Sequence, residues 1–153
     1  MSLFIATGSN LGDKLLHLKE ARDILSTHFK FIAESRIYES PAVDYLNQPN
    51  FYNQVLEFKV PDELPQNVIK KLLEIENLMG RNRIIPKGPR VIDIDILFWN
   101  FDQISLPDLT IPHPRLFERS FVVLPLSELP GFLILKTKFS FKFTFDNTAN
   151  PIS

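Results

Sequence analysis

The chain has 153 residues, of which 44% are apolar and 23% are charged, with a net charge of −1 and no cysteine. These values are typical of one folded domain with a single core, and they exclude a disordered or collagen-like chain. The absence of cysteine excludes a disulfide framework, a thiol nucleophile and cysteine-based zinc sites, and it indicates a reducing compartment. The near-neutral charge excludes a general attraction to nucleic acid or anionic lipid, so any anion site has to be local.

The sequence contains no apolar run that approaches the roughly 18 residues of a membrane span. Its first residues, Met-Ser-Leu-Phe-Ile-Ala, lack the basic segment and the long apolar stretch of a secretory signal. No repeat, low-complexity tract or linker divides the chain. We therefore expect a single domain over residues 1–153, cytoplasmic and monomeric, with neither a membrane nor nucleic acid as its partner.

The first part of the chain predicts a strand, a helix and a further extended segment. Residues 3–6 form a short apolar strand that ends at a Gly-Ser-Asn turn over residues 8–10. Asp13 can cap a helix that we expect over residues 14–26. Residues 29–39, which are rich in aromatic and branched side chains, favour an extended chain.

The middle of the chain predicts a second unit of strand, helix and strand. Residues 51–60 alternate between a mostly apolar face and a mixed one, as a strand does. Pro65 opens a helix with an apolar stripe, and Gly80 closes it. In residues 91–98 the even positions are isoleucines and a final phenylalanine, which indicates another strand. The resulting order, βαββαβ, predicts an α+β fold with a ferredoxin-like core, in which helices pack on an antiparallel sheet.

C-terminal additions are expected after this core. A proline-rich loop leads to a short helix near residues 115–120 and to an apolar segment over residues 121–126. Phenylalanines then alternate with polar residues from Phe139 to Phe145, which predicts a last strand.

Two carboxylates stand at alternate positions of the strand Val-Ile-Asp-Ile-Asp-Ile-Leu-Phe. The period of a strand places Asp93 and Asp95 on one face of the sheet, while the isoleucines bury the other face. Adjacent carboxylates repel each other, and a divalent cation between them relieves that repulsion. An oxygen-only site suits magnesium, and two ions roughly 3.5–4 Å apart can clamp a transferring phosphoryl group. Taken alone, the pair also fits an acidic outer strand face that has no function.

A basic loop precedes this strand. Residues 80–90 read Gly-Arg-Asn-Arg-Ile-Ile-Pro-Lys-Gly-Pro-Arg and carry four cations where glycine and proline exclude regular structure. Polyphosphate transfer requires arginines that hold phosphate oxygens next to acids that bind metal ions. A solvated basic loop is the alternative interpretation.

One histidine lies between two prolines, in Ile-Pro-His-Pro-Arg-Leu-Phe-Glu-Arg (residues 111–119). The prolines favour an extended backbone and fix the direction of the His113 side chain. A histidine there can donate to a phosphate or act as an acid or base, although it also fits an ordinary loop.

Together, these segments carry a family resemblance. Gly-Ser-Asn-Leu-Gly-Asp (residues 8–13), Gly-Pro-Arg-Val-Ile-Asp-Ile-Asp-Ile-Leu (residues 88–97) and the histidine segment occur in the order and spacing of one family. They resemble the 6-hydroxymethyl-7,8-dihydropterin pyrophosphokinases over about residues 2–130. The resemblance implies a folate-biosynthesis enzyme that transfers the pyrophosphoryl group of MgATP to the pterin hydroxymethyl oxygen and releases AMP.

The same resemblance implies a set of site residues. It implies that Asp93 and Asp95 bind two magnesium ions. It also implies that these aspartates are catalytic, together with Arg81 and Arg90. It assigns the remaining contacts with ATP to Glu76, Arg83, His113 and Arg119. It assigns the pterin pocket to Ser40, Pro41, Ala42, Val43, Phe51, Asn53 and Phe121. Aromatic rings can sandwich the flat heterocycle, and an asparagine can donate to and accept from its edge.

Three features depart from the family pattern. Lys87 stands where an aromatic residue, often tryptophan, commonly precedes the Gly-Pro-Arg run, so the loop lacks the ring that would stack on the substrates. Asp108 stands at a position that can be basic. Beyond Gly131 the usual tail is not recognisable, so we expect the alternating phenylalanines to pack rather than to bind.

Two other functions fit parts of the pattern. Another magnesium-dependent nucleotidyl-transfer enzyme on a ferredoxin-like fold would use the same Asp-x-Asp pair but release pyrophosphate. An RNA-binding module would stack bases on strand aromatics. The net charge and the two acids argue against the RNA-binding module.

Overall fold

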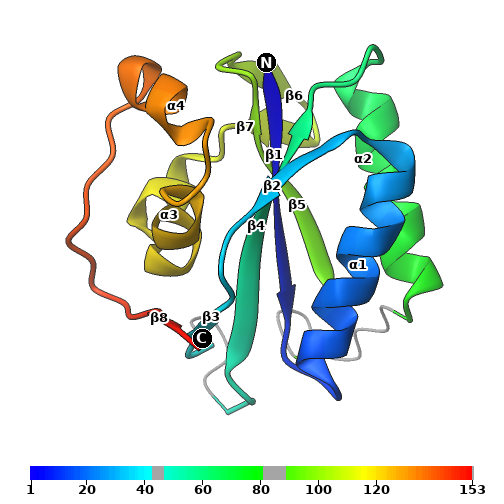
Figure 1. The fold of residues 1–153 in the computed structure, drawn as a ribbon, viewed down its shortest axis with the longest axis vertical. Helices are drawn as coiled ribbons and strands as arrows, with labels where there is room; N and C mark the ends of the chain where they lie inside the picture. Colours follow the sequence, from blue (N-terminus) through cyan, green and yellow to red (C-terminus); the bar gives the residue numbers. More distant parts are fainter. Residues whose placement is uncertain (43–46, 81–88, 153) are drawn as a thin grey trace.

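The fold is seen in a computed structural model, which describes residues 1–42, 47–80 and 89–152. One sheet lies at its centre, with α1 and α2 on one face and α3 and α4 on the other (Figure 1). The elements in chain order are β1 (Ser2–Ser9), α1 (Lys14–His28), β2 (Phe31–Glu34), β3 (Tyr38–Ser40), β4 (Phe51–Lys59), α2 (Pro65–Leu78), β5 (Asp93–Trp99), β6 (Ile104–Leu106), β7 (Leu109–Ile111), the 3-10 helix η1 (Pro114–Glu118), α3 (Ser120–Leu126), α4 (Phe132–Lys138) and β8 (Asn150–Pro151).

The sheet is antiparallel and has the order β5-β1-β4-β3-β8, with β2 also paired to β4. The predicted α+β class is therefore confirmed, and the order of the core elements is compatible with the predicted ferredoxin-like core. β1 and β4 are buried on both faces, because each lies between other strands and beneath helices of both layers.

Local sequence signals determine where α1 begins and where α2 begins and ends. The Asp13 side chain accepts a hydrogen bond from the backbone N–H of Leu16, at 3.2 Å, which caps α1 as predicted. Pro65 occupies the first turn of α2, and Gly80 lies just beyond the end of that helix with a φ of +92°, a conformation that favours glycine.

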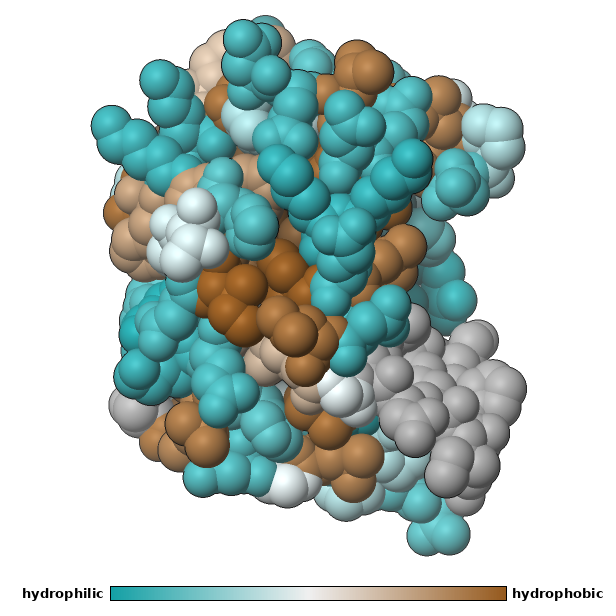
Figure 2. Space-filling model, turned by 90° about the vertical axis from the view of Figure 1, so that its right-hand side faces the viewer, coloured by the Kyte–Doolittle hydropathy of each residue, from teal (hydrophilic) through white to brown (hydrophobic). Residues whose placement is uncertain are grey.

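On the outer side of the layer formed by α1 and α2, polar side chains surround an apolar patch (Figure 2).

Two hydrophobic cores lie on opposite faces of the sheet. The first core joins α1 and α2 to the isoleucines of the β5 segment, and the second core joins α3 and α4 to Phe4 and Val55. The predicted alternation of β5 side chains between the two faces of the sheet does not continue to the end of the strand. The register with β1 shifts by one residue at Leu97, so Leu97 and Phe98 both pack in the second core. Phe98 was predicted on the isoleucine face, and that prediction is wrong.

The predicted strand from Phe139 to Phe145 is also wrong. Residues 132–138 form α4, residues 139–149 have no regular secondary structure, and only Asn150 and Pro151 pair with the sheet. The phenylalanine alternation has another cause, because Phe139 and Phe141 pack on the second core. Phe139 lies 5.2 Å from Phe98 and Phe141 lies 4.9 Å from Phe132, measured between ring centroids.

The hairpin of β6 and β7 was not predicted from the sequence. Among the described residues, no helix is both long enough and apolar enough to cross a membrane.

A glycine allows α4 to pack closely on the sheet. A Cβ atom on Gly131 would lie 2.6 Å from both Phe4 Cζ and Glu57 Oε2, while the Gly131 N–H donates to Glu57 Oε1 at 3.0 Å. We expect Gly131→Ala to lower the free energy of unfolding by about 1–3 kcal/mol, since both neighbours are buried. Denaturant unfolding followed by circular dichroism measures this, and an unchanged midpoint would show that the contact relaxes freely.

Candidate active site

A cleft with a volume of about 590 Å³ crosses one end of the sheet. Its walls come from β1, β3, β4, β5 and α2, together with the β6–β7 turn, η1 and the start of α3. This volume lies within the range of small-molecule sites, roughly 300–1,000 Å³. The described residues with predicted roles that line the cleft are Ser40, Pro41, Phe51, Asn53, Glu76, Arg90, Asp93, Asp95, His113, Arg119 and Phe121.

Asp93 and Asp95 lie in the cleft at the start of β5. Their partners in the register with β1 are Gly8 and Ala6. The residue between them, Ile94, is buried in the first core, so the two carboxylates occupy the opposite face, as the strand period predicts. Asp93 is half-buried, whereas Asp95 is exposed.

Arg90 connects this acidic pair with the aromatic part of the cleft. Its Nη1 atom lies 2.7 Å from Asp93 Oδ2, and its guanidinium carbon lies 4.9 Å from the centroid of the Phe51 ring. Both charged side chains of the ion pair are largely buried, at 14% and 18% exposure. A planar guanidinium can form an ion pair along its edge and stack on a ring with its face, which a lysine ammonium cannot do.

Asn10 holds the backbone of Arg90 in place, a role that was not predicted from the sequence. The Arg90 N–H donates to Asn10 Oδ1 at 2.8 Å, and the Asn10 N–H donates to the Arg90 carbonyl at 3.1 Å. Asn10 Nδ2 also donates to Gln48 Oε1 at 2.8 Å and to the Pro49 carbonyl at 3.0 Å. The Gly-Ser-Asn turn was the available signal, but it indicated the end of a strand and part of a family motif, with no role for Asn10 itself.

Removal of the Asn10 side chain therefore has a specific expected effect. We expect Asn10→Ala to lower kcat by roughly tenfold to a hundredfold, since a displacement of about 1 Å in a positioning group has effects of that size. Asn10→Asp keeps the oxygen that accepts from Arg90 and is expected to retain more activity than the alanine variant. Steady-state rates of both variants measure this, and equal rates for Asn10→Ala and the wild type would exclude the role.

Glu76 fixes the first residues of β5 from α2. Its side chain is buried at 4% exposure, and Oε2 accepts a hydrogen bond of 2.6 Å from the Ile94 N–H. Because Ile94 lies between the two aspartates, this bond ties the acidic pair to α2. Glu76 also lines the cleft, where the resemblance implies a contact with ATP.

His113 lies at the start of η1 with an extended backbone (φ −68°, ψ 129°), as the flanking prolines predict. The Arg115 N–H donates to its Nδ1 atom at 3.1 Å. With Nδ1 acting as an acceptor, the neutral ring carries its proton on Nε2, which is then a donor. Arg119 lies nearby in sequence, with its guanidinium carbon 5.9 Å from the Phe121 ring centroid.

The predicted pterin residues form the other part of the cleft. Asn53 is buried, and its Nδ2 donates to Ser40 Oγ at 2.8 Å. Gly8 lies beside it, where a Cβ atom would approach Asn53 Oδ1 to 3.3 Å. Ala42 is buried and is not among the described residues that line the cleft.

A contact between Tyr38 on β3 and Glu128 after α3 joins the two sides of the cleft that carry the predicted pterin residues. The Tyr38 hydroxyl donates to the Glu128 carboxylate, which also lies 3.0 Å from Arg36 Nη2. Burial alone would raise the pKa of Glu128, but the hydrogen bonds from Tyr38 and Arg36 outweigh it and lower that pKa. Burial first, and then the Glu128 carboxylate, raises the pKa of Tyr38. The hydroxyl therefore stays a donor, and it joins β3 to the segment after α3.

Four residues singled out in the sequence lie outside the described residues: Val43, Arg81, Arg83 and Lys87. The described lining includes two further charged residues to which the sequence assigned no role, Asp108 and Arg115. Arg115 belongs to the histidine segment and Asp108 precedes it, but only the fold shows that both line the cleft.

The acidic pair is the candidate place for a metal ion. Among the described residues, no group of three or more His, Cys, Asp and Glu side chains is placed to hold a metal ion. Two carboxylates on one strand face nevertheless fit magnesium, which binds one or two protein carboxylates and completes its shell with substrate phosphates and water.

Comparison with known proteins gives consistent matches. Residues 4–131 match the family model for 7,8-dihydro-6-hydroxymethylpterin-pyrophosphokinase. The chain is 39% identical over 128 residues to a Bacillus subtilis protein named 2-amino-4-hydroxy-6-hydroxymethyldihydropteridine pyrophosphokinase, covering 82% of this chain and 76% of that protein. It is 36% identical over 152 residues to the Aquifex aeolicus protein of the same name, covering 98% of this chain and 94% of that one.

Some relatives are much longer than this chain. The chain is 40% identical over 135 residues to the folic acid synthesis protein fol1 of Pneumocystis carinii. That match covers 87% of this chain but only 18% of the relative. The corresponding protein of Dictyostelium discoideum is matched over 20% of its length.

Proposed function

The chain belongs to the 7,8-dihydro-6-hydroxymethylpterin-pyrophosphokinase family, and on that premise we propose that it transfers pyrophosphate from ATP to 6-hydroxymethyl-7,8-dihydropterin. The observation that carries this proposal is the placement of Arg90. Its guanidinium contacts Asp93 at 2.7 Å and the Phe51 ring at 4.9 Å, so one side chain links the acidic and the aromatic parts of one cleft. A transfer between a polyphosphate and an aromatic acceptor requires those two parts to be adjacent.

Asp93 and Asp95 are the proposed ligands of two magnesium ions. Bound magnesium would neutralise phosphate charge and orient the polyphosphate of ATP. The carboxylate pair supports this role through its hard oxygen donors and its position on one face of β5. Glu76 holds the strand that presents both carboxylates, and it is proposed to border the ATP site from α2.

The cationic side of the cleft is proposed to bind the phosphates. Arg90 and Arg119 would hold phosphate oxygens, together with Arg81 and Arg83 from the preceding loop. His113 would donate from Nε2, because the Arg115 N–H already occupies its Nδ1. These donors would stabilise the charge that spreads over the transferring group.

The pterin is proposed to lie between Phe51 and Phe121, beside Asn53. The Asn53 Nδ2 group already donates to Ser40, so its Oδ1 is the atom proposed to accept from the heterocycle edge. Pro41 lines the proposed pocket after β3. The family resemblance adds Ala42 and Val43 to it, although Ala42 is buried outside the described lining.

In the proposed reaction, the pterin hydroxymethyl oxygen forms a bond to the β-phosphorus of ATP. The bond from that phosphorus to the oxygen that bridges it to the α-phosphate breaks, and AMP leaves with that oxygen. The hydroxyl proton passes to solvent, and the β- and γ-phosphates stay together on the pterin. This outcome distinguishes the reaction from nucleotidyl transfer, which would release pyrophosphate.

Chromatography of the reaction products tests the proposal. Incubation with MgATP and 6-hydroxymethyl-7,8-dihydropterin is expected to give AMP and the pterin pyrophosphate in equal amounts, and AMP only when the pterin is present. Release of pyrophosphate would instead support the nucleotidyl-transfer alternative. The monomeric state and the cytoplasmic location expected from the sequence stay predictions.

A further inference from the structure

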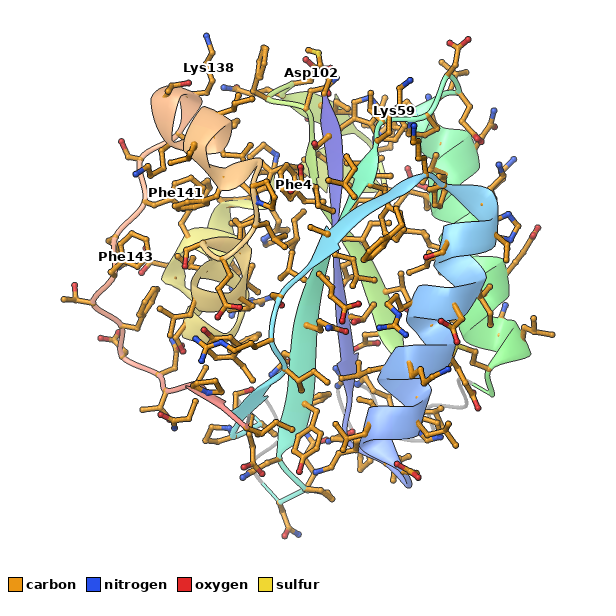
Figure 3. The ribbon with its side chains drawn as sticks, in the orientation of Figure 1. Phe4, Lys59, Asp102, Lys138, Phe141 and Phe143 are labelled. Atoms are coloured by element: carbon orange, nitrogen blue, oxygen red, sulfur yellow. The ribbon has the colours of Figure 1, made fainter. Side chains whose placement is uncertain are left out.

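The C-terminal segment over residues 139–152, here called the strap, lies outside the residues that match the family model. It leaves α4 and crosses the outer side of α3 and α4 before it reaches the edge of the sheet (Figure 1). The rings of Phe141 and Phe143 lie on the side of the strap that faces these helices (Figure 3). Phe141 packs on the second core, whereas Phe143 is 52% exposed and touches Phe132.

The strap contacts one wall of the cleft through Asn147. Its Oδ1 atom accepts from the Ser120 N–H at 2.8 Å and from Ser120 Oγ at 2.6 Å, while its Nδ2 donates to the Glu118 carbonyl at 2.8 Å. These bonds bracket Arg119 and fix the junction between η1 and α3. Ser120 is buried, and both of its neighbours, Arg119 and Phe121, line the cleft.

The end of the strap contacts the opposite wall. Asn150 pairs with Glu39 and Pro151 pairs with Tyr38, which adds β8 to the edge of the sheet beside β3. The Ile152 N–H also donates to the Ile37 carbonyl at 3.0 Å. β3 ends at Ser40, the partner of Asn53. The strap therefore joins the α3 wall and the β3 wall of the same part of the cleft.

We propose that the strap is a positioning element for the pterin acceptor, with Asn147 as the positioning residue. This inference rests on the proposed function, because it assigns Phe121 and Ser40 to the pterin pocket. The acidic pair lies on β5, at the far edge of the sheet from β8, so the strap acts on the acceptor more than on the nucleotide. A segment beyond the residues that match the family model thus helps to set the distance between the walls that hold the acceptor, together with the bond between Tyr38 and Glu128.

Kinetics of Asn147 variants test the inference. We expect Asn147→Ala to raise KM for 6-hydroxymethyl-7,8-dihydropterin by about fivefold or more, the equivalent of one or two lost hydrogen bonds. KM for MgATP is expected to rise too, but less, because Arg119 is a proposed ATP contact beside these bonds, whereas Arg90 and the acidic pair lie away from the strap. Asn147→Asp keeps the Oδ1 atom that accepts from Ser120 but loses the Nδ2 donor to the Glu118 carbonyl, so it is expected to restore the pterin KM only in part.

Phe143→Ala is the matched control within the strap. It removes a ring that contacts Phe132 and does not belong to the described lining of the cleft, so the pterin KM is expected to stay unchanged. If Asn147→Ala does not fold, Ser120→Ala removes one of the same bonds and is expected to raise the pterin KM by a smaller factor.

Three results would overturn the inference. An unchanged pterin KM in folded Asn147→Ala would exclude the positioning role. An equal or larger rise in the KM for MgATP would assign the strap to general stability or to the nucleotide. A wild-type chain that neither turns over nor binds the pterin would refute the proposed function itself, and the inference with it.

Discussion

Asp95→Ala is expected to lower pterin-dependent turnover by about a thousandfold or more, because loss of a metal ligand removes several kcal/mol of transition-state stabilisation. The fold is expected to survive, since Asp95 is exposed in the cleft while its neighbours Ile94 and Ile96 hold β5 in the first core. Rates of AMP release and the thermal unfolding midpoint measure the two effects separately.

Asp102→Ala is the control for this substitution. Asp102 is an exposed carboxylate shortly after β5 and does not belong to the described lining of the cleft (Figure 3). Its replacement is expected to leave turnover unchanged. Collapse of the fold in Asp95→Ala, rather than loss of turnover, would mean that the acidic face of the strand has only a structural role.

Arg90→Lys is expected to lower kcat/KM by about a hundredfold although the charge is kept. The guanidinium forms an ion pair with Asp93 and stacks on Phe51 at the same time, and lysine cannot reproduce that geometry. Both the pterin KM and kcat are therefore expected to change. Full steady-state kinetics, with each substrate varied in turn, measure the two contributions.

Arg22→Lys offers a matched control for Arg90→Lys. Arg22 on α1 pairs with Glu34 at the same distance of 2.7 Å, but neither residue is part of the described lining of the cleft. Exposed ion pairs of this kind contribute little to stability, so activity and unfolding are expected to stay near the wild-type values. An Arg90→Lys variant with wild-type kcat/KM would show that only the charge at this position matters.

The parts of the fold that depend on local pattern were predictable from the sequence. The cap of α1 at Asp13 and the glycine after α2 follow from backbone hydrogen bonding and conformational preference. The common face of Asp93 and Asp95 follows from the strand period. These features require only neighbouring residues, so a single sequence contains the information.

The missed features depend on contacts between distant residues. The register shift at Leu97 arises in the pairing of β5 with β1, and it moves Phe98 to the other core. The phenylalanines from Phe139 onward alternate as a strand does, yet Phe139 and Phe141 pack on the second core outside any strand. Alternation reports one buried side and does not specify whether strands or helices cover it.

The site shows the same division between local and distant contacts. The carboxylate pair and the histidine segment were recognisable by their local chemistry, whereas the connections of Asn10 with Arg90 and of Asn147 with Ser120 join residues 80 and 27 positions apart. Arg115 and Asp108 reach the cleft only through the fold of the β6–β7 hairpin and η1. Both stand in or beside the histidine segment, but residue spacing in a single sequence does not show that they line the cleft.

The fate of isotopically labelled phosphorus tests the central claim most directly. With ATP labelled at the β-phosphorus, we predict that the label appears in the pterin product, and with ATP labelled at the α-phosphorus, that it stays in AMP. This result would establish that the pyrophosphoryl group is transferred and that AMP is the leaving group. Label from the α-phosphorus in the pterin product, or transfer of the γ-phosphate alone, would contradict the account and indicate nucleotidyl or simple phosphoryl transfer instead.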